Sequence, residues 1–399
     1  MTQLRDVAIV GAGLLGLAAG RALAARGRDV VVLEQAEIGH QGAGSKGQSR
    51  IFRLGYPEPS YVKAAVQARD LWHELEAESG RQILWPTPQL TFGAGLRGVH
   101  DAMRAAGAPC ELLSAAAAAE RFPAVVIGGP ALLEPESCVI AADEALAALA
   151  QRVPEIAAGV RVMSLTDDGR QVTLRTSRGK LTARAAIISA GPWSSGLLAT
   201  AGVSIPSRPT LEQVGYLRPA HRDVPAGQAG QAADGRPAGR ARSASDGMPI
   251  FICHADRAPY GLPVPKSPLY KIGIHQTGPV TDPDAQEQSA DARLLARLAE
   301  VARQHLPGYD PEPAVTERCI YDNSPDEDFI LDRTGNVVIG SGTSGHGFKF
   351  GPLLGEWLAQ LAAGEPAPQP HRFGLARFRP PSPLRRRPPS TAGWAPGTQ

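Results

Sequence analysis

Residues 7–34 read VAIVGAGLLGLAAGRALAARGRDVVVLE, and this stretch decides the fold class. An apolar run enters a glycine turn over residues 11–16, an alanine-rich and leucine-rich segment follows, and a second apolar run closes on Glu34. This order predicts a strand, a tight turn, a helix over residues 14–26 and a second strand. Together they form the βαβ unit of a dinucleotide-binding α/β fold.

Each glycine of the turn has a physical role. Gly11 permits the tight turn, Gly13 lets the backbone approach a pyrophosphate, and Gly16 lets the helix pack on the strand. Glu34 is placed to accept a hydrogen bond from a ribose 2′-hydroxyl, and its charge would repel a 2′-phosphate. FAD and NAD therefore fit this unit better than NADP, and residues 7–34 alone leave the choice between these two open.

The composition is that of an ordinary globular protein. The chain has 399 residues, of which 43% are hydrophobic and 20% charged, and its formal net charge is +2. This length suffices for two core-forming units. Nothing indicates a nucleic-acid surface, and no apolar run reaches 18 residues, so we expect no nucleic-acid partner and no membrane span. The four cysteines are scattered without CxxC spacing, which favours neither a metal site nor disulfides and fits a cytoplasmic location.

The remaining pattern predicts further elements of both domains. Helical spacing predicts a helix over residues 59–80 that stops at Gly80, and an amphipathic helix over residues 289–305. Residues 161–184 predict a meander of three short strands, and residues 186–191 a separate buried strand that ends at Gly191 and returns the chain to the parallel sheet. A second glycine-rich turn, at 340–347, leads into a helix near the C-terminus.

These elements indicate an α/β fold in which one domain is threaded through the other. The cofactor domain, built on a Rossmann-like parallel sheet, is expected from residues 1–85, 140–205 and 315–378. The substrate domain, built on a mixed or antiparallel sheet, is expected from residues 86–139 and 206–314, with a flexible insertion at 223–247 and a disordered Pro/Arg-rich tail at 379–399.

Several segments occur together and in order along the chain. They are the glycine turn with Glu34, GSKGQSRIFR at 44–53, YGLP at 260–263, KIGIH at 271–275, RCIY at 318–321 and SGHGFKF at 344–350. In this combination residues 7–378 resemble the family of monomeric sarcosine oxidase and N-methyltryptophan oxidase, within the wider D-amino-acid-oxidase-like flavoproteins. The resemblance implies FAD as the cofactor.

The resemblance also implies a covalent flavin. Cys319 would carry FAD through a thioether to the 8α-methyl group, and a neighbouring cation such as Arg318 could favour this by lowering the pKa of the thiol. A lone cysteine is also, from the sequence alone, a small buried hydrophobe. The residues expected at the cofactor are Gly11, Gly13, Gly16, Glu34, Ser45, Arg50, Gly191, Cys319, Gly345, Gly347 and Lys349.

Four residues match the family's reactive groups. Lys271 matches the lysine that holds a water at flavin N5 and activates oxygen, although an exposed strand lysine is an equal reading of the sequence. Arg50 matches the arginine stacked over the flavin. Arg53 and Lys349 match a clamp for the substrate carboxylate, with Arg53 capable of bidentate pairing.

Four further residues are expected around the substrate. Tyr260, His275 and Tyr321 match residues that line the family's substrate cavity, and packing roles stay open for all three. Lys46 stands where the family often has a histidine and adds a cation near the ring. The candidate catalytic residues are thus Lys271, Arg50, His275 and Tyr260, and the candidate substrate-binding residues are Arg53, Lys349, Tyr321 and Lys46.

The expected activity is FAD-dependent oxidation of a secondary amine, in an N-methylated or cyclic amino acid, to an imine. Hydride passes to the flavin and O2 is reduced to hydrogen peroxide, by a monomer whose only partners are an amino-acid-like substrate and O2. Alternatives are a flavin dehydrogenase that uses another electron carrier, a NAD-dependent dehydrogenase and a dinucleotide-binding module without turnover. The last ranks lowest because Arg53 and Lys349 are present.

Overall fold

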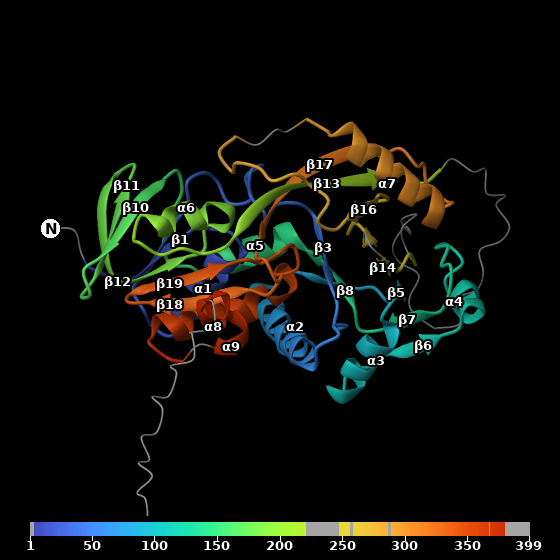
Figure 1. The fold of residues 1–399 in the computed structure, drawn as a ribbon, viewed down its shortest axis with the longest axis horizontal. Coiled ribbons are helices and arrows are strands. Elements are labelled where there is room, and N and C mark those ends of the chain that lie inside the picture. The colour runs from blue at the N-terminus through green and yellow to red at the C-terminus, as the bar shows by residue number, and fades with distance from the viewer. Residues whose placement is uncertain (1–3, 221–246, 256–257, 286–288, 367, 380–399) are drawn as a thin grey trace, which may run out of the picture.

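The computed structural model describes residues 4–220, 247–255, 258–285, 289–366 and 368–379. Residues 223–246 of the predicted insertion and residues 380–399 of the predicted tail lie outside the described residues. Figure 1 shows the described chain as an elongated body, with one sheet near the N-terminus and a second sheet that includes the strands β5 to β7 and lies beside the helix α7.

The first sheet contains the predicted βαβ unit, as β1 (Arg5–Val10), α1 (Leu14–Ala25) and β2 (Val30–Leu33). Its other strands are β9 (Ile156–Ala157), β10 (Val162–Asp167), β11 (Val172–Thr176), β12 (Gly179–Ile188), β18 (Ile330–Thr334) and β19 (Val337–Ser341). The five strands β9, β2, β1, β12 and β19 pair in this order, and each pairing among them is parallel. This parallel core confirms the predicted α/β class.

β12 differs from the prediction. The sequence suggested a short meander strand followed by a separate buried strand, whereas the structure has one strand of ten residues. Its first half pairs antiparallel with β11 and its second half pairs parallel with β1, and Ala183 is a register partner in both pairings. The prediction of two strands was wrong because Arg184, which is exposed, does not interrupt the ladder.

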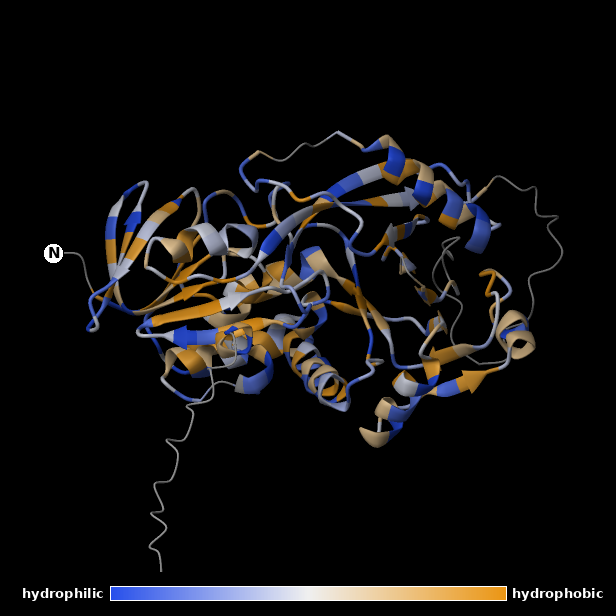
Figure 2. Ribbon diagram, in the orientation of Figure 1, coloured by the Kyte–Doolittle hydropathy of each residue, from blue (hydrophilic) through white to orange (hydrophobic). Residues whose placement is uncertain are grey.

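Both faces of the parallel sheet are covered, which explains its continuous apolar strands. On one face Ile9 packs in a core with α1, α2 (Pro59–Ser79), α5 (Ala142–Ala150) and α8 (Gly351–Ala362). On the other face Val10 packs with the β10–β11 ladder and α6 (Ser194–Ala199). Figure 2 shows hydrophobic colour along the strands of this sheet. The chain leaves α2 through Gly80 at φ 67°, as the sequence predicts.

The second sheet has eight strands. In order they are β17 (Val315–Asn323), β13 (Arg208–Leu217), β16 (Tyr270–Ile274), β15 (Pro259–Pro263), β14 (Ile250–His254), β5 (Gln89–Gly93), β7 (Ala131–Glu134) and β6 (Glu111–Leu113). All pairings are antiparallel except that of β14 with β5, so the predicted mixed sheet is confirmed. α7 (Ala292–His305) covers it, capped by the Asp291 carboxylate.

A small sheet of β3 (Ser49–Phe52), β8 (Cys138–Ala141) and β4 (Leu84–Pro86) joins the two larger sheets. The remaining elements are α3 (Leu96–Ala105), α4 (Ala115–Arg121), α9 (Pro370–Phe373) and the 3₁₀ helices η1 (Gly191–Trp193), η2 (Phe348–Phe350) and η3 (Leu375–Phe378). β17 pairs within the second sheet, and its C-terminal end leads into β18 of the first. The exact domain boundaries stay a prediction.

No helix in the described part of the chain is long and apolar enough to cross a membrane. All four cysteines are unpaired.

The packing of α1 on α8 depends on glycine and gives a stability prediction. A Cβ atom at Gly355 would lie 2.5 Å from both the backbone carbonyl carbon and the Cβ of Ala18, on the facing helix. We expect Gly355→Ala to lower the free energy of unfolding by about 1–3 kcal/mol through overpacking, measured by denaturant titration.

Gly98→Ala is the matched control, because Gly98 also lies in a helix but a Cβ there meets nothing within 4 Å. Its replacement should be neutral or stabilising. Equal stability of the two variants would contradict the proposed helix contact.

Candidate functional site

A cavity of about 1080 Å³ opens between the first sheet, the small sheet and the second sheet. It is lined by almost every residue that the sequence singled out: Gly11, Gly13, Glu34, Ser45, Lys46, Arg50, Arg53, Gly191, Tyr260, Lys271, His275, Cys319, Tyr321, Gly345, Gly347 and Lys349. Gly16 lies behind the lining, where a Cβ atom would be 1.9 Å from the Gly11 carbonyl oxygen. The tertiary fold thus gathers residues that are some three hundred positions apart.

One end of the cavity is the turn between β1 and α1. Gly11 has φ 101°, and a Cβ there would lie 2.6 Å from the Ser189 carbonyl oxygen, so only glycine fits. Ser45 accepts a hydrogen bond from the Leu14 amide (3.1 Å) at the start of α1. The buried Glu34 carboxylate accepts from the amide of Ala12 (2.8 Å) and also faces the cavity.

This end fits a dinucleotide on two observations. A Cβ at Gly13 would crowd the Ser45 hydroxyl at 3.2 Å, so glycine leaves the backbone here open to the cavity. The turn also presents the N-terminus of α1, whose amides and dipole favour an anion, to the cavity. Elsewhere in the lining, the buried Ser49 hydroxyl has no hydrogen-bond partner within the described chain.

The middle of the cavity holds three cations near Cys319. Lys271 is 5% exposed, and its Nζ donates to the Ser49 carbonyl oxygen at 3.2 Å. All five residues of β16 are buried because it lies between β13 and β15, which removes the reading of Lys271 as an exposed strand lysine. Burial and the nearby Arg50 lower the pKa of Lys271 to about 7.

Arg50 and Lys46 complete this group of cations. The Arg50 guanidinium donates to the carbonyls of Ser49 (2.9 Å) and Lys46 and lies 5.4 Å from the ring centre of Phe348. Lys46 is buried and donates to the Gln41 amide oxygen at 2.8 Å. Burial lowers the pKa of Lys46.

The expected role of Arg318 is wrong. Cys319 lines the cavity, but Arg318 precedes it on a strand and therefore points to the opposite face. There Arg318 donates to the carbonyl oxygens of Ser289 (3.0 Å) and Leu211 (3.4 Å). Burial raises the pKa of the Cys319 thiol, and the cations that oppose this rise are Lys271, Arg50 and Lys46 rather than Arg318.

The two expected clamp residues meet at Tyr56, which the sequence reasoning missed. The Arg53 guanidinium carbon lies 4.2 Å from the ring centre of Tyr56, and Arg53 Nη1 donates to the Gly55 carbonyl oxygen. Lys349 Nζ donates to the Tyr56 hydroxyl (3.0 Å) and to the His346 carbonyl oxygen (2.8 Å). Burial and Arg53 hold the pKa of Lys349 well below its usual range. Two cationic side chains that line the same part of the cavity suit a carboxylate.

The three expected cavity side chains lie beside this clamp. The rings of His275 and Tyr321 are 5.7 Å apart, and both line the cavity with Tyr260. Burial, together with Arg53 and Lys349, lowers the pKa of His275 to about 4. A Cβ at Gly345 would lie 2.1 Å from the Tyr321 ring, so this glycine allows Tyr321 to reach the cavity.

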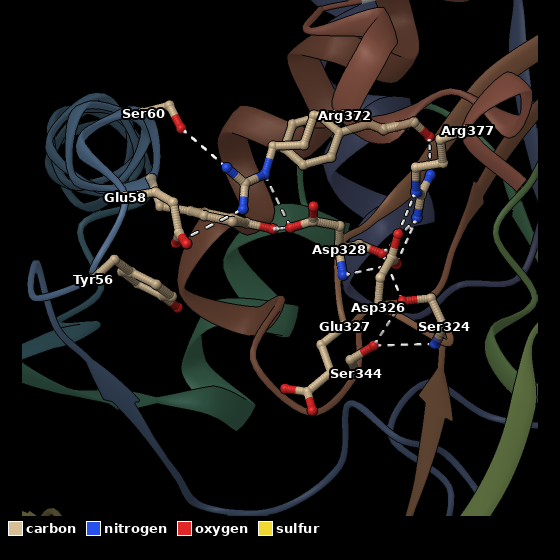
Figure 3. Close-up of polar contacts among 12 residues, drawn as sticks. Tyr56, Glu58, Ser60, Ser324, Asp326, Glu327, Asp328, Ser344, Arg372 and Arg377 are labelled. Carbon is tan, nitrogen blue, oxygen red and sulfur yellow. Dashed lines mark hydrogen bonds and ion pairs between the residues drawn. The ribbon is translucent and has the colours of Figure 1, made fainter. Parts of the chain in front are cut away.

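A cluster at the cavity rim was also missed (Figure 3). Asp328 accepts from the Tyr61 hydroxyl (2.7 Å) and from Arg372 Nε (3.0 Å), while Arg377 pairs with Asp326 at 2.8 Å. These two ion pairs fix the C-terminal elements α9 and η3 to the loop after β17. The signal in the sequence was the run of three acids at 326–328 directly after a strand.

Comparison with known proteins agrees with this geometry. The sequence profile of the family described as FAD dependent oxidoreductase matches residues 6–361. The peroxisomal sarcosine oxidase of Mus musculus is 34% identical over 400 residues, which cover 95% of this chain and 96% of that protein. The monomeric sarcosine oxidase of Bacillus sp. (strain NS-129) is 31% identical, with 90% and 92% covered.

Among solved structures, the open form of NikD, an unusual amino acid oxidase essential for nikkomycin biosynthesis, superposes with a TM-score of 0.77 at 26% identity. The match covers 94% of this chain and 98% of that one. These matches confirm the resemblance found in the sequence. They also show that the cofactor is FAD and not NAD, a choice that residues 7–34 left open. The chain therefore belongs to the FAD dependent oxidoreductase family, with sarcosine oxidases among its relatives.

Proposed function

We propose that this protein oxidises the secondary amine of an N-methylated or cyclic amino acid, with FAD as its cofactor and O2 as the final oxidant. The observation that carries the proposal is the clamp of two cations, the half-buried Arg53 and the buried Lys349, in the same cavity as the dinucleotide turn and Lys271. The names of the sarcosine oxidase relatives support the choice of an N-methyl amino acid.

The cofactor residues divide along the cavity. Gly11, Gly13, Gly16, Glu34, Ser45 and Gly191 would serve the adenosine and pyrophosphate part, and Arg50, Cys319, Gly345, Gly347 and Lys349 the ring part. When bound, FAD supplies a ring that takes a hydride equivalent from the carbon beside the amine and passes two electrons to O2. We further propose that the Cys319 thiolate holds the ring through a thioether, a reading supported by the thiol's place in the lining among three cations.

The substrate would be held by its carboxylate. Arg53 offers two parallel N–H donors and Lys349 a point charge, and both act in a buried site where ionic hydrogen bonds are strong. His275, Tyr260 and Tyr321 would surround the amine. His275, with its pKa lowered to about 4, is uncharged at neutral pH, so it does not repel the substrate and is too weak a base to hold the amine proton.

Lys271, Arg50 and Lys46 would stabilise the negative charge that develops as oxygen is reduced. A fixed cation facing that charge in a water-poor site favours the transition state without reorganisation. This supports an oxidase that releases hydrogen peroxide over a dehydrogenase that uses another carrier. We also propose a monomer, by analogy with the monomeric relative, and a cytoplasmic location, which the unpaired thiols support.

A peroxide-coupled screen of N-methyl and cyclic amino acids tests the function. We expect the purified yellow protein to consume O2 and to form one equivalent of peroxide with at least one secondary amine that carries a carboxylate. The methyl ester of the same substrate should be far poorer, because the clamp then loses its anion. Fast anaerobic bleaching of the flavin with slow recovery in air would instead identify a dehydrogenase.

Replacing Cys319 tests the covalent flavin. We expect flavin to stay with the acid-denatured wild-type polypeptide and to enter the supernatant from Cys319→Ala, measured by absorbance of the two fractions. Cys253→Ala is the control, because Cys253 does not line the cavity. Flavin that remains attached to the Cys319→Ala polypeptide would mean that another residue carries it.

The pKa of Lys271, about 7, predicts a pH dependence of the reaction with oxygen. Lys271 is protonated below this pH, so the rate constant for flavin reoxidation by O2 should fall as the pH rises through about 7. In Lys271→Met the rate constant should be low at every pH, with anaerobic reduction by substrate much less affected. Stopped-flow absorbance measures both half-reactions, and equal losses in the two would contradict the role.

A further inference from the structure

Glu134 is a buried carboxylate that the proposed reaction does not use. It ends β7 of the second sheet and is 1% exposed. Within the described part of the chain no cation forms an ion pair with it. Burying a charge in this way is costly unless hydrogen bonds replace the lost water.

Two of the hydrogen bonds that Glu134 accepts come from the segment that carries Arg53. One carboxylate oxygen accepts from the amides of Leu54 (3.1 Å) and Gly55 (2.8 Å), the two residues directly after Arg53. The other oxygen accepts from the side chains of Gln89 (2.8 Å) and Thr91 (3.4 Å) on the neighbouring strand β5. Glu134 therefore fastens the turn behind Arg53 to the second sheet.

The contact continues to the Arg53 guanidinium. A Cβ at Gly55 would lie 2.4 Å from the Glu134 carboxylate, so the peptide approaches the acid as closely as only glycine allows. The carbonyl oxygen of the same Gly55 accepts a hydrogen bond from Arg53. The position of the guanidinium thus depends on Glu134 through one peptide unit.

Glu134 also balances the charge of the clamp. Arg53 lowers the pKa of the Lys349 ammonium, and Glu134 is the acid that raises it. Burial raises the pKa of Glu134 itself, and Arg53 opposes that rise, so the acid and the two clamp cations are coupled electrostatically.

Three other titratable groups near the clamp carry no charge at neutral pH. Burial raises the pKa of Tyr56 to about 12, and His275 and His346 have lowered pKa values, so all three are uncharged. Glu58 lies 3.7 Å from Arg372, and Glu327 lies 4.0 Å from His275.

We propose that Glu134 is a positioning residue for the carboxylate clamp: it orients Arg53 through the Gly55 peptide and supplies a fixed negative charge beside the clamp. The role rests on the proposed function, because it presumes that Arg53 and Lys349 bind the substrate carboxylate. It adds to that function a residue that sets how strongly the clamp binds a carboxylate.

Glu134→Gln tests the proposal, because it keeps the size of the side chain, removes the charge and leaves one oxygen to accept hydrogen bonds. The probe is propionate, a carboxylate without an amine, titrated into the FAD-loaded enzyme while the visible flavin spectrum is recorded across a pH series. We expect the variant to bind propionate about tenfold more weakly at neutral pH. As the pH rises, propionate binding by the variant should weaken at a lower pH than in the wild type, because Lys349 then loses its proton more easily. Acidification should restore part of the affinity.

Glu136→Gln is the matched control, since Glu136 lies two residues further on, is largely exposed and pairs with Arg69. Its affinity and pH midpoint should equal those of the wild type. Wild-type binding by Glu134→Gln, or a loss that is the same at every pH, would overturn the proposal, because a purely structural acid would not move the midpoint.

Glu134→Asp serves if the glutamine variant does not fold or retain FAD. It keeps the charge but shortens the reach, so we expect a wild-type pH midpoint with weaker binding, and unchanged affinity would again overturn the proposal. Anaerobic reduction of the wild type by N-methyl amino acids is measured in parallel. A wild type that binds propionate as described but is not reduced by any of them would refute the amine oxidase function and leave the role of Glu134 standing.

Discussion

The architecture depends on burying several cations in one cavity. Lys46, Lys271 and Lys349 are each at least nine-tenths buried, and a buried ammonium is tolerated only where hydrogen bonds and nearby acids replace water. Backbone carbonyls and amide oxygens supply most of these bonds, as with Lys271 on Ser49 and Lys349 on His346. A site so built attracts anions, whether a substrate carboxylate or the reduced products of electron transfer.

Each of the three sheets carries a different part of the cavity lining. The parallel sheet ends in the glycine turn at Gly11, where close contact with Ser189 leaves no room for a side chain. The second sheet brings Lys271 and Cys319 to the middle of the cavity. Arg50 lies on β3 of the small sheet. The turn that follows β3 holds Arg53, and Glu134 fastens this turn to the second sheet.

The extent of successful prediction differed between the fold and the site. The βαβ unit at 7–34, the helix ending at Gly80 and the mixed second sheet follow from periodicity and turn residues, which are local properties of the chain. The single strand β12 was missed because one strand changes from an antiparallel to a parallel partner along its length, and that depends on which strands lie beside it. Arg318 was misassigned because adjacency in a strand places neighbours on opposite faces.

By itself, the sequence determined that a dinucleotide binds near residues 11–16 and, through its resemblance, which residues to look for. Those inferences needed only short-range spacing and residue chemistry. The tertiary structure alone decided that Lys271 is buried, that Arg53 and Lys349 meet at Tyr56, and that Glu134 stands behind them. The physical reason is that burial and electrostatic balance arise from groups distant in the chain, so no local pattern records them.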